Sequence, residues 1–442
     1  MAHAARDTSV VVVGGGFAGV GCAKALAKAH VPVTLIDQHN YHTFQPMLYQ
    51  VATAQLASSD VARSLRGIFR KDQTVAVKMA EVTDVDPATR TVHCSDGSSF
   101  SGDYLVLAMG SRANYFETPG AVDHTIALYA LDDAQRLRTR ILEVFEDADR
   151  NPQLLDKGAL NFVVIGAGAT GVETAGALAD LINEVMVLRY RDLDVGRAEI
   201  HLIDPGQVVL GPFSDKAHEY ASNVLERGGV KLRLGLTAKA IQADRVVLSD
   251  GSEILTRTVV WAGGLQAASL AGHAGLPQGR GGRLDVAADL TVEGHPGVYA
   301  VGDVANIAGP DGRPFPQLGS VALQAGQWAA KNILADLDGH SPEPFRYHDK
   351  GIMAMIGRNA AVAEMGEHRH ELHGGIAFAA WLGVHAYLLT GVRQRIDAFV
   401  SWGWDYFSKS RSSGILDRPD TAQIDWGEDD DDEGAPEEAS AR

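Results

Sequence analysis

Residues 9–37 constrain the fold of this chain more strongly than any other stretch. They open with four consecutive valines, a β-branched run without polar alternation that is typical of a buried parallel strand. Three glycines follow at G-x-G-x-x-G spacing: Gly14, Gly16 and Gly19. A helical pattern over residues 18–28 and a second apolar strand, which ends in Asp37, complete the unit. A strand, a glycine turn, a helix, a strand and a terminal acid in this order predict a dinucleotide-binding βαβ unit.

Each residue type in this unit has a physical role. Gly14 permits the tight turn, Gly16 lets the backbone approach a pyrophosphate, and Gly19 allows the helix to pack closely on the strand. Backbone N–H groups and the positive end of the helix dipole then bind the anion. Asp37 stands where a carboxylate accepts hydrogen bonds from the ribose hydroxyls of an adenosine. We expect the aromatic and amide-rich loop that follows to line the cofactor, rather than to be a plain surface loop, and to enter a helix near Leu48.

The same pattern recurs from residue 161. A predicted strand over residues 161–165 leads to Gly166, Gly168 and Gly171, and a later strand over residues 199–203 ends in Asp204. We assign the extra length before this acid to an insertion at residues 185–198, whose charges indicate a solvated surface segment. Two such units in one chain imply two dinucleotides, most simply a bound flavin and a nicotinamide that visits it. Asp204 suits a free ribose 2′-hydroxyl and would repel a 2′-phosphate, which favours NADH over NADPH.

Other apolar strands also end in glycines. Residues 104–108 lead to Gly110, residues 259–264 include Gly263, and residues 297–303 end in Gly302 and Asp303. A glycine at a strand end lets the backbone approach a ligand. Asp303 is expected to bind flavin ribityl hydroxyls or water on the phosphates, and the alternative is a helix cap. The helix predicted over residues 320–334 would point its N-terminus at the flavin and stabilise the anionic reduced ring.

Length, charge and cysteine content limit the remaining choices. With 442 residues, the chain should form two or three domains. Its net charge of -17 argues against nucleic-acid binding, although much of this charge lies after Trp426. Two distant cysteines form no disulfide framework, which fits a reducing cytoplasm. No charged-then-apolar leader precedes the first strand, so we expect no secretory signal.

No metal site is expected in this sequence. His368, His370 and His373 lie in a polar run between strand-like segments, where exposed hairpin side chains are more common than ligands. The acidic, apolar-poor tail, residues 419–442, is expected to be disordered. It also lacks the rigid ligand spacing of a calcium loop.

Residues 374–407 predict two helices that lie on a membrane surface. The first is apolar almost all round but is short for a spanning helix. The second has an apolar stripe formed by Ile396, Phe399, Val400, Gly403 and Phe407. Trp381, Trp402 and Trp404, together with nearby cations, suit a membrane interface. The residues alone leave open a dimer interface or a helix packed on the core.

The chain resembles the type II NADH dehydrogenases, which are single-subunit flavoprotein NADH:quinone oxidoreductases, over residues 9–416. The shared stretches are VVVVGGGFAG, YHTFQPMLYQVATA, LVLAMGS, VVIGAGATGVETAGAL, VVWAGG, VYAVGDVA, YHDKGIMAMIGR and WLGVHAYLLTGVRQRI. The resemblance implies three catalytic residues: Glu173 beside flavin and nicotinamide, Lys350 near the quinone end of the flavin, and Gln324 near the quinone. Ser320 stands where the family commonly has a further glutamine.

The expected fold class is α/β, with two Rossmann-like dinucleotide-binding domains and C-terminal amphipathic membrane-associating helices. We assign residues 1–120 and 290–345 to a discontinuous FAD domain, 121–289 to an NADH domain and 346–418 to the membrane-associating region. The residues expected to contact FAD are Gly14, Gly15, Gly16, Phe17, Ala18, Gly19, Asp37, Gln38, Gln45, Val82, Ala108, Gly110, Gly302, Asp303, Ala322 and Leu323. Those expected to contact NADH are Gly166, Gly168, Gly171, Asp204 and Gly263.

The resemblance implies an FAD enzyme on the cytoplasmic side of the cell membrane. It would oxidise NADH and reduce menaquinone or ubiquinone without pumping protons, and it could also form a homodimer. The quinone would enter through a tunnel floored by the C-terminal helices, near Gln324, Lys350 and Gln45. The alternatives are a soluble flavoprotein reductase that serves a small redox protein, or an NADH-sensing flavoprotein scaffold. A disulfide or sulfide oxidoreductase of the same fold needs a cysteine pair beside the flavin, which this sequence does not provide.

Overall fold

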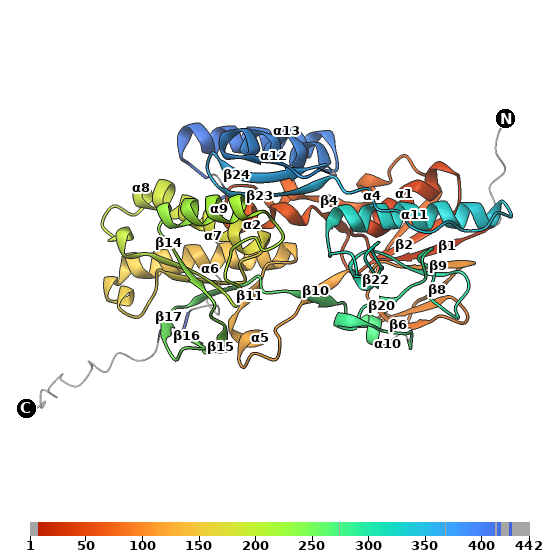
Figure 1. Ribbon diagram of the computed structural model, residues 1–442, viewed down its shortest axis with the longest axis horizontal. Coiled ribbons are helices and arrows are strands. Elements are labelled where there is room, and N and C mark those ends of the chain that lie inside the picture. Colours follow the sequence, from red (N-terminus) through yellow and green to blue (C-terminus); the bar gives the residue numbers. More distant parts are fainter. Residues whose placement is uncertain (1–7, 274, 367, 412, 417–423, 427–442) are drawn as a thin grey trace, which may run out of the picture.

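The computed structural model shows two α/β units side by side along the long axis of the molecule (Figure 1). A smaller layer, made of a three-stranded sheet and two helices, covers one side of the second unit. The structure describes residues 8–273, 275–366, 368–411, 413–416 and 424–426. Most of the predicted acidic tail, residues 419–442, therefore lies outside the described residues.

The first unit is built on a parallel sheet of strand order β21-β9-β1-β2-β5. Its strands are β1 (Val10–Val13), β2 (Val33–Asp37), β5 (Val75–Met79), β9 (Tyr104–Leu107) and β21 (Val298–Ala300). Strand β1 lies in the middle, with Val10 in register with both Val33 and Tyr104. All four valines of β1 are buried, as expected for a central strand whose sheet is covered on both faces.

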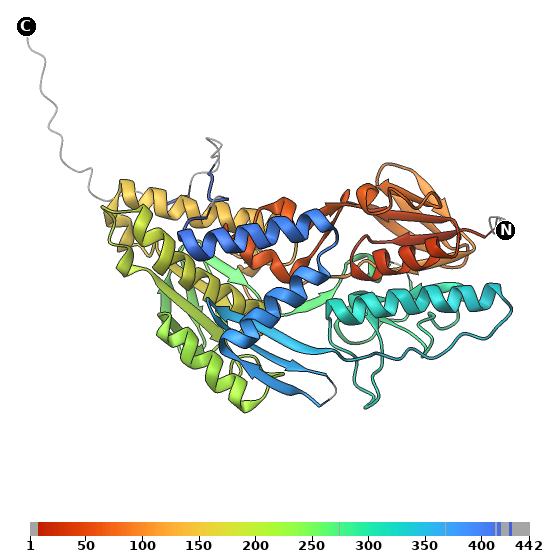
Figure 2. The same cartoon turned by 90° about the horizontal axis from the view of Figure 1, so that it is seen from above.

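Helices α1 (Phe17–Lys28) and α11 (Gly319–Leu337) pack side by side on this sheet (Figure 2). Their backbones touch, because a Cβ atom at Gly326 would overlap the carbonyl group of Ala18. Only glycine permits so close an approach. At the N-terminal ends, a Cβ at Gly319 would lie 3.2 Å from the ring of Phe17. The two helix N-termini, and the partial positive charges that they carry, therefore begin next to each other.

The second unit repeats the architecture with a parallel sheet of order β11-β18-β12-β13-β14. Its strands are β11 (Ile126–Ala127), β12 (Asn161–Ile165), β13 (Glu199–Asp204), β14 (Val230–Leu234) and β18 (Thr258–Trp261), and its helices are α6 (Leu131–Arg150), α7 (Ala169–Leu181) and α9 (Asp215–Arg227). Helix α6 is amphipathic and turns Leu137, Ile141 and Phe145 into the core. Helix α7 continues as a π-turn (Ile182–Met186) and as α8 (Val187–Arg189).

The chain crosses between the units through an antiparallel ribbon of β10 (Ser111–Ala113) and β19 (Leu265–Ala267). Ala267, Ala271 and Leu284 then pack in the core around β1, so the chain rejoins the first unit before the predicted boundary at residue 290. In the other direction, α2 (Leu48–Ala52) packs on α6 and α7 in the core of the second unit. The two units therefore share core segments as well as a linker.

Shorter elements complete the two units. Small antiparallel sheets are formed by β6 (Val82–Asp86), β7 (Thr91–Cys94) and β8 (Ser99–Ser101), by β15 (Ala238–Ile241), β16 (Arg245–Leu248) and β17 (Glu253–Leu255), and by β3 (Tyr41–Thr43) with β4 (Ala62–Ser64). A parallel pair is formed by β20 (Leu284–Asp285) and β22 (Ala305–Asn306). The short helices are α3 (Ser58–Val61), α4 (Leu65–Ile68), α5 (Ala121–His124) and α10 (Leu270–His273).

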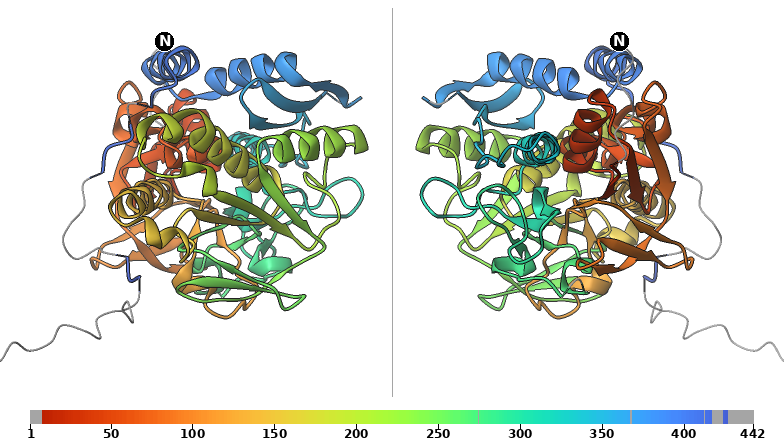
Figure 3. Two further views of the ribbon diagram at one scale, coloured as in Figure 1. Left: turned by 90° about the vertical axis from the view of Figure 1, so that its left-hand side faces the viewer. Right: turned by 90° about the vertical axis from the view of Figure 1, so that its right-hand side faces the viewer.

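The covering layer consists of an antiparallel sheet and two helices that lie across the top of the molecule (Figure 3). Its elements are β23 (Gly351–Gly357), β24 (Ala360–Met365), β25 (His370–His373), α12 (Gly374–Leu388) and α13 (Val392–Ser408). Strand β23 lies directly on α7, because a Cβ at Gly176 would overlap the carbonyl oxygen of Ile356. The side chains of His368, His370 and His373 are exposed, as the hairpin prediction requires.

Among the described residues, no helix combines the length and apolarity needed to cross a membrane. Helices α12 and α13 carry ten of the 18 exposed large apolar side chains of the described residues, including Ile396 and Phe407 of the predicted stripe. The expectation that three tryptophans lie at an interface is wrong for two of them. Trp381 and Trp402 are 0% and 6% exposed, because they pack inward on each other and toward α2, whereas Trp404 is 61% exposed.

Candidate active site

The first glycine turn forms a cradle with one open face. Gly14 has φ +104°, and a Cβ there would overlap the carbonyl group of Ala108. A Cβ at Gly19 would overlap the carbonyl oxygen of Gly14. A Cβ at Gly16, by contrast, would meet no atom within 4 Å. The first and third glycines are therefore required by the protein's own packing, and the middle glycine leaves space for a ligand, as a pyrophosphate cradle requires.

Asp37 fixes this turn to the end of β2. Its Oδ2 accepts a hydrogen bond of 2.5 Å from the N–H of Gly15, and its Oδ1 accepts one of 2.7 Å from the N–H of His39. Burial raises the pKa of Asp37, and the two backbone N–H groups oppose that effect. A carboxylate oxygen accepts more than one hydrogen bond, so the predicted contact with a ribose is compatible with these bonds.

The second glycine turn has the same geometry, position by position. Gly166 has φ +103° and stands against the carbonyl of Ala262, and Gly171 stands against the carbonyl of Gly166. A Cβ at Gly168 would again meet nothing within 4 Å. Asp204 accepts hydrogen bonds of 2.7 Å from the N–H groups of Ala167 and Gly206. Two cradles of this form fit two dinucleotides, because each leaves open space beside its middle glycine for a pyrophosphate.

The predicted flavin residues converge where α1 and α11 begin. A Cβ at Gly302 would lie 3.0 Å from the Cβ of Ala18 and 3.4 Å from that of Ala322. Asp303 is buried beside this point, and its Oδ2 accepts a 3.0 Å hydrogen bond from Ser111 Oγ. Asp303 therefore does not act as the helix cap that was the alternative, because it bonds a side chain from β10 instead of a following backbone N–H.

The remaining predicted cofactor residues lie on several different elements. Ala108 contacts Gly14, and Leu323 contacts Gly21 of α1. Gly110 has φ +72°, and a Cβ there would lie 3.1 Å from the hydroxyl of Tyr129. Gln45 donates a hydrogen bond to the carbonyl of Tyr129, and Gln38 lies on the exposed turn after β2. Val82 begins β6, and Gly263 lies beside the ring of Trp261.

Glu173 lies at the inner end of a cavity of about 240 Å³. Its side chain is buried on α7, and its Oε1 accepts a 3.2 Å hydrogen bond from the N–H of Met355 in β23. Burial raises the pKa of Glu173 to about 8, against the opposing effect of that hydrogen bond. The carboxyl group is therefore predominantly protonated at neutral pH. The cavity runs from this group to apolar side chains of α12 and α13: Phe378, Leu382, Phe399, Trp402 and Phe407.

A buried hydrogen-bonded chain joins α2 to α13 along the cavity wall. Trp402 Nε1 donates a 2.8 Å bond to Gln50 Oε1, and Gln50 Nε2 donates a 3.1 Å bond to the Tyr49 hydroxyl. The Tyr49 hydroxyl lies 3.4 Å from the sulfur of Met355. Sequence reasoning assigned Trp402 to a membrane interface and did not single out Tyr49 or Gln50, although both stand in one of the stretches shared with the family.

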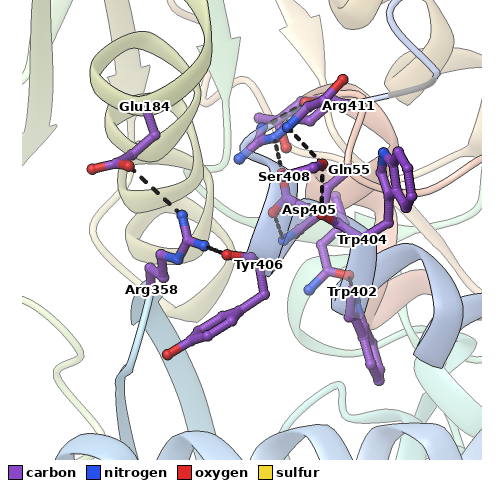
Figure 4. Close-up of polar contacts among 12 residues, drawn as sticks. Gln55, Glu184, Arg358, Trp402, Trp404, Asp405, Tyr406, Ser408 and Arg411 are labelled. Carbon is purple, nitrogen blue, oxygen red and sulfur yellow. Dashed lines mark hydrogen bonds and ion pairs between the residues drawn. The ribbon is translucent and has the colours of Figure 1, made fainter.

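Charged side chains form the outer rim of the cavity (Figure 4). Arg358 lies 3.7 Å from Glu184 and also donates a hydrogen bond to the carbonyl of Tyr406. Asp405 of α13 accepts a 2.9 Å bond from Gln55 Nε2 and pairs with the buried Arg411 at 3.2 Å. This rim ties α13 and the segment after it to α7.

The structure separates Gln324 and Lys350 from the cavity. Both polar ends of the Gln324 amide bind the backbone of His348, at 3.0 Å and 2.9 Å. Ser320 Oγ lies 2.9 Å from the Tyr347 hydroxyl. Lys350 is exposed and precedes β23, whose Met355 bonds Glu173. Five extended residues span about 16 Å, so the backbone of Lys350 lies about that far along the strand from the N–H group that bonds Glu173.

The fold and the paired cradles define a flavoprotein with two dinucleotide-binding units. Residues 8–326 match the family of pyridine nucleotide-disulphide oxidoreductases. Within that class the chain belongs to the type II NADH:quinone oxidoreductases. It is 34% identical over 422 residues to the type II NADH:quinone oxidoreductase Ndh of Mycobacterium tuberculosis, which covers 92% of this chain and 89% of the relative. The corresponding protein of Staphylococcus saprophyticus is 30% identical, with 80% and 88% covered.

Solved structures show the same fold. NDH2 from Plasmodium falciparum in complex with NADH matches with a TM-score of 0.83 and 20% identity, covering 91% of this chain and 99% of that one. The sulfide:quinone oxidoreductase of Aquifex aeolicus matches with a TM-score of 0.71 and 18% identity, covering 91% and 96%. Together these comparisons confirm the predicted family, enzyme class and cofactor set. Both cysteines, Cys22 and Cys94, are free and buried, so they provide no disulfide for a redox reaction.

Proposed function

We propose that the protein oxidises NADH on the second cradle and reduces a quinone in the Glu173 cavity, with FAD held by the first cradle between them. The observation that supports this most is the cavity itself, which joins a buried carboxyl group to the apolar helices α12 and α13. FAD, when bound, accepts hydride and passes electrons to a second substrate. The residues of this chain bind, orient and shield the two substrates.

The proposed role of Glu173 is to position the nicotinamide and to hold a proton. A neutral carboxyl group in a dry site donates one hydrogen bond and accepts others, so it can orient an amide without attracting bulk water. The adjoining N-termini of α1 and α11 would stabilise negative charge that develops beside them. Lys350 would favour a charged reduced species from the other end of β23. Gln324 would act by holding the backbone that carries Lys350 in place, because both ends of its amide bond the backbone of His348.

We also propose that α12 and α13 lie on the cytoplasmic surface of the cell membrane. Their exposed apolar side chains face outward, and Arg393 and Lys409 supply flanking cations. A quinone could then pass from the bilayer between these helices into the cavity. A homodimer interface is the competing use of the same surface.

The decisive experiment is anaerobic and sequential. Purified protein is mixed with NADH and then with a menaquinone or ubiquinone analogue while flavin absorbance is followed. The proposal expects bleaching by NADH and recovery of the colour with the quinone. Bleaching without recovery would contradict quinone reduction and favour a reductase for a small redox protein or an NADH-sensing scaffold.

Membrane binding is tested separately by flotation with vesicles that contain anionic lipid. The variant Phe407→Ser, at a side chain that is 86% exposed, should reduce flotation, whereas Val122→Ser, at an exposed apolar site on α5, should not. Equal flotation of both variants would contradict the proposed surface. A monomer–dimer change in Phe407→Ser would assign the surface to dimerisation.

A further inference from the structure

Three carboxyl groups stand along one wall of the cavity. Glu173, Asp180 and Glu184 belong to α7 and the π-turn that continues it, and all three line the same cavity. Spacings of seven and four residues place side chains on one helix face. Ala177 occupies the turn between Glu173 and Asp180, also on the cavity wall, and contributes only a methyl group there. Seven residues of helix rise by about 10 Å, so these two carboxyl groups stand about that far apart along the wall, a distance that water or a quinone head group in the cavity can span.

The three carboxyl groups of this row differ in burial. Glu173 is buried at the inner end, whereas Asp180 is half-buried and the side chain of Glu184 is 35% exposed at the rim. The row of three carboxyl groups therefore leads from solvent at the rim to Glu173, which lies beside the proposed reaction site. Figure 4 shows the outer end, where Glu184 and Arg358 face each other.

The charged groups around the row come from several elements. Arg358, which follows β23, and Arg411 and Asp405, from α13 and the segment after it, act on Asp180. Lys409 pairs with Glu184 at 2.6 Å and Arg358 lies 3.7 Å from it. The hydroxyl of Tyr49 in α2 lies near Glu173. Burial nevertheless raises the pKa of Asp180 to about 6, so it can gain and lose a proton near neutral pH.

The proposed reaction needs one proton from solvent in each turnover. Conversion of a quinone to a quinol adds two electrons and two protons. The hydride of NADH carries both electrons and one proton, so the second proton must come from water. The cavity has a charged rim and Glu173 is buried at its inner end, so this proton must travel from the rim along the groups that line the cavity wall.

We propose that Asp180 and Glu184 form a proton path along α7 that delivers this solvent proton to the quinone oxygen at the inner end of the cavity. The inference rests on the proposed function. Glu184 takes a proton from water and passes it to Asp180. Asp180 releases it toward the reduced quinone and Glu173, and is then protonated again from the rim. Asp180 and Glu184 are thus assigned a role in quinone reduction and none in the transfer from NADH.

The test compares Asp180→Asn and Glu184→Gln with two matched controls, Asp192→Asn and Glu219→Gln, at exposed acids away from the cavity. Each FAD-loaded protein is mixed anaerobically with NADH, and the reduced protein is then mixed with a water-soluble quinone analogue at pH 7.5. Reduction by NADH should stay within about twofold in all four variants. Reoxidation should slow by about 10- to 100-fold in Asp180→Asn and by a smaller factor in Glu184→Gln, in the range of lost proton-transfer catalysis.

Two readouts separate a proton path from a structural role. The solvent deuterium isotope effect on reoxidation should rise in Asp180→Asn, and added imidazolium should restore part of its rate. Slow reoxidation with neither change would overturn the proposal, and so would reoxidation of both variants at the wild-type rate. If Asp180→Asn fails to retain FAD, Glu184→Gln at the half-exposed rim decides by the same two readouts. Failure of the wild-type protein to be reoxidised by quinone would instead overturn the proposed function.

Discussion

The two cradles of this molecule share one backbone geometry but differ in what covers them. In the first, Ala18 is buried under α11, and the ring of Phe17 packs edge-on against His42 and Phe44, with ring centroids 5.2 Å and 5.7 Å away. In the second, the corresponding Ala169 and Thr170 are exposed. We infer that the glycines determine which class of ligand binds, and that the side chains packed over each cradle determine how slowly the ligand dissociates. An enclosed cradle suits a resident flavin, and an open one suits a nicotinamide that exchanges.

The middle glycines offer the sharpest test, with the largest expected effect. Gly16→Val and Gly168→Val each place a side chain where the free protein has open space, so both variants should fold. Gly16→Val should be isolated without flavin. Gly168→Val should keep its flavin, but its reduction by NADH at a fixed low concentration should slow by about 100-fold or more, as expected for loss of a phosphate-binding backbone contact. Flavin content and stopped-flow reduction measure the two effects, and each variant is the control for the other.

The cover over the first cradle can be loosened without touching the glycine turn. In Gly326→Ala the new methyl group would overlap the Ala18 carbonyl, so α11 must move away from α1. We expect FAD affinity to fall by about 10- to 100-fold, since overpacking costs about 1–3 kcal/mol. Gly383→Ala on α12, where a Cβ meets nothing within 4 Å, is the control and should leave FAD affinity unchanged. Equal FAD affinity in both variants would show that the cover does not determine retention.

The second cradle can be probed through Glu173, which lies on the helix that the cradle begins. The raised pKa, about 8, means that the group is neutral below that pH and ionises above it. Flavin reduction by NADH should therefore slow as pH rises through about 8 in the wild type. Glu173→Gln, which is always neutral, should be slower by about 10-fold or more and should lose this titration. An unchanged pH profile in the variant would remove Glu173 from the reaction.

The last prediction concerns stability rather than turnover, and it involves His42, which contacts the glycine turn of the first cradle. Its Nδ1 lies 2.9 Å from the carbonyl oxygen of Gly15, so Nδ1 carries the hydrogen, and burial lowers the pKa of the ring to about 4 from 6.5. The unfolded chain binds a proton below pH 6.5 and the folded chain does not until about pH 4. The free energy of unfolding should therefore fall by up to about 3 kcal/mol as pH drops across that window.

The variant His42→Asn keeps a donor near Gly15 but cannot titrate. Its FAD release, followed by flavin fluorescence, should depend less on pH between 6.5 and 4 than that of the wild type. Parallel release curves for the two proteins would show that this histidine does not control acid stability.

The sequence predicted both cradles, because strand burial, glycine spacing and a terminal acid are local properties that one stretch of chain determines. The buried valines of β1 were predicted for the same reason. The cavity could not be predicted from the sequence, because it depends on contacts between distant parts of the chain. Trp402 bonds Gln50 across 352 positions, and Glu173 bonds Met355 across 182.

The same limit explains the errors. Trp381 and Trp402 have the composition of interfacial residues, and only the packing of α12 and α13 on α2 buries them. The placement of Gln324 near the quinone stays a prediction, and the sequence did not indicate that the segment after α11 folds back and bonds both ends of its amide.

The most direct test of this account is the nucleotide content of the purified wild-type protein after extensive dialysis. We expect a yellow protein that retains one equivalent of FAD and no nicotinamide nucleotide, and that binds and releases NADH within each turnover. A colourless protein that flavin cannot reconstitute, or one that retains a nicotinamide nucleotide and exchanges its flavin freely, would contradict the assignment of the enclosed and open cradles.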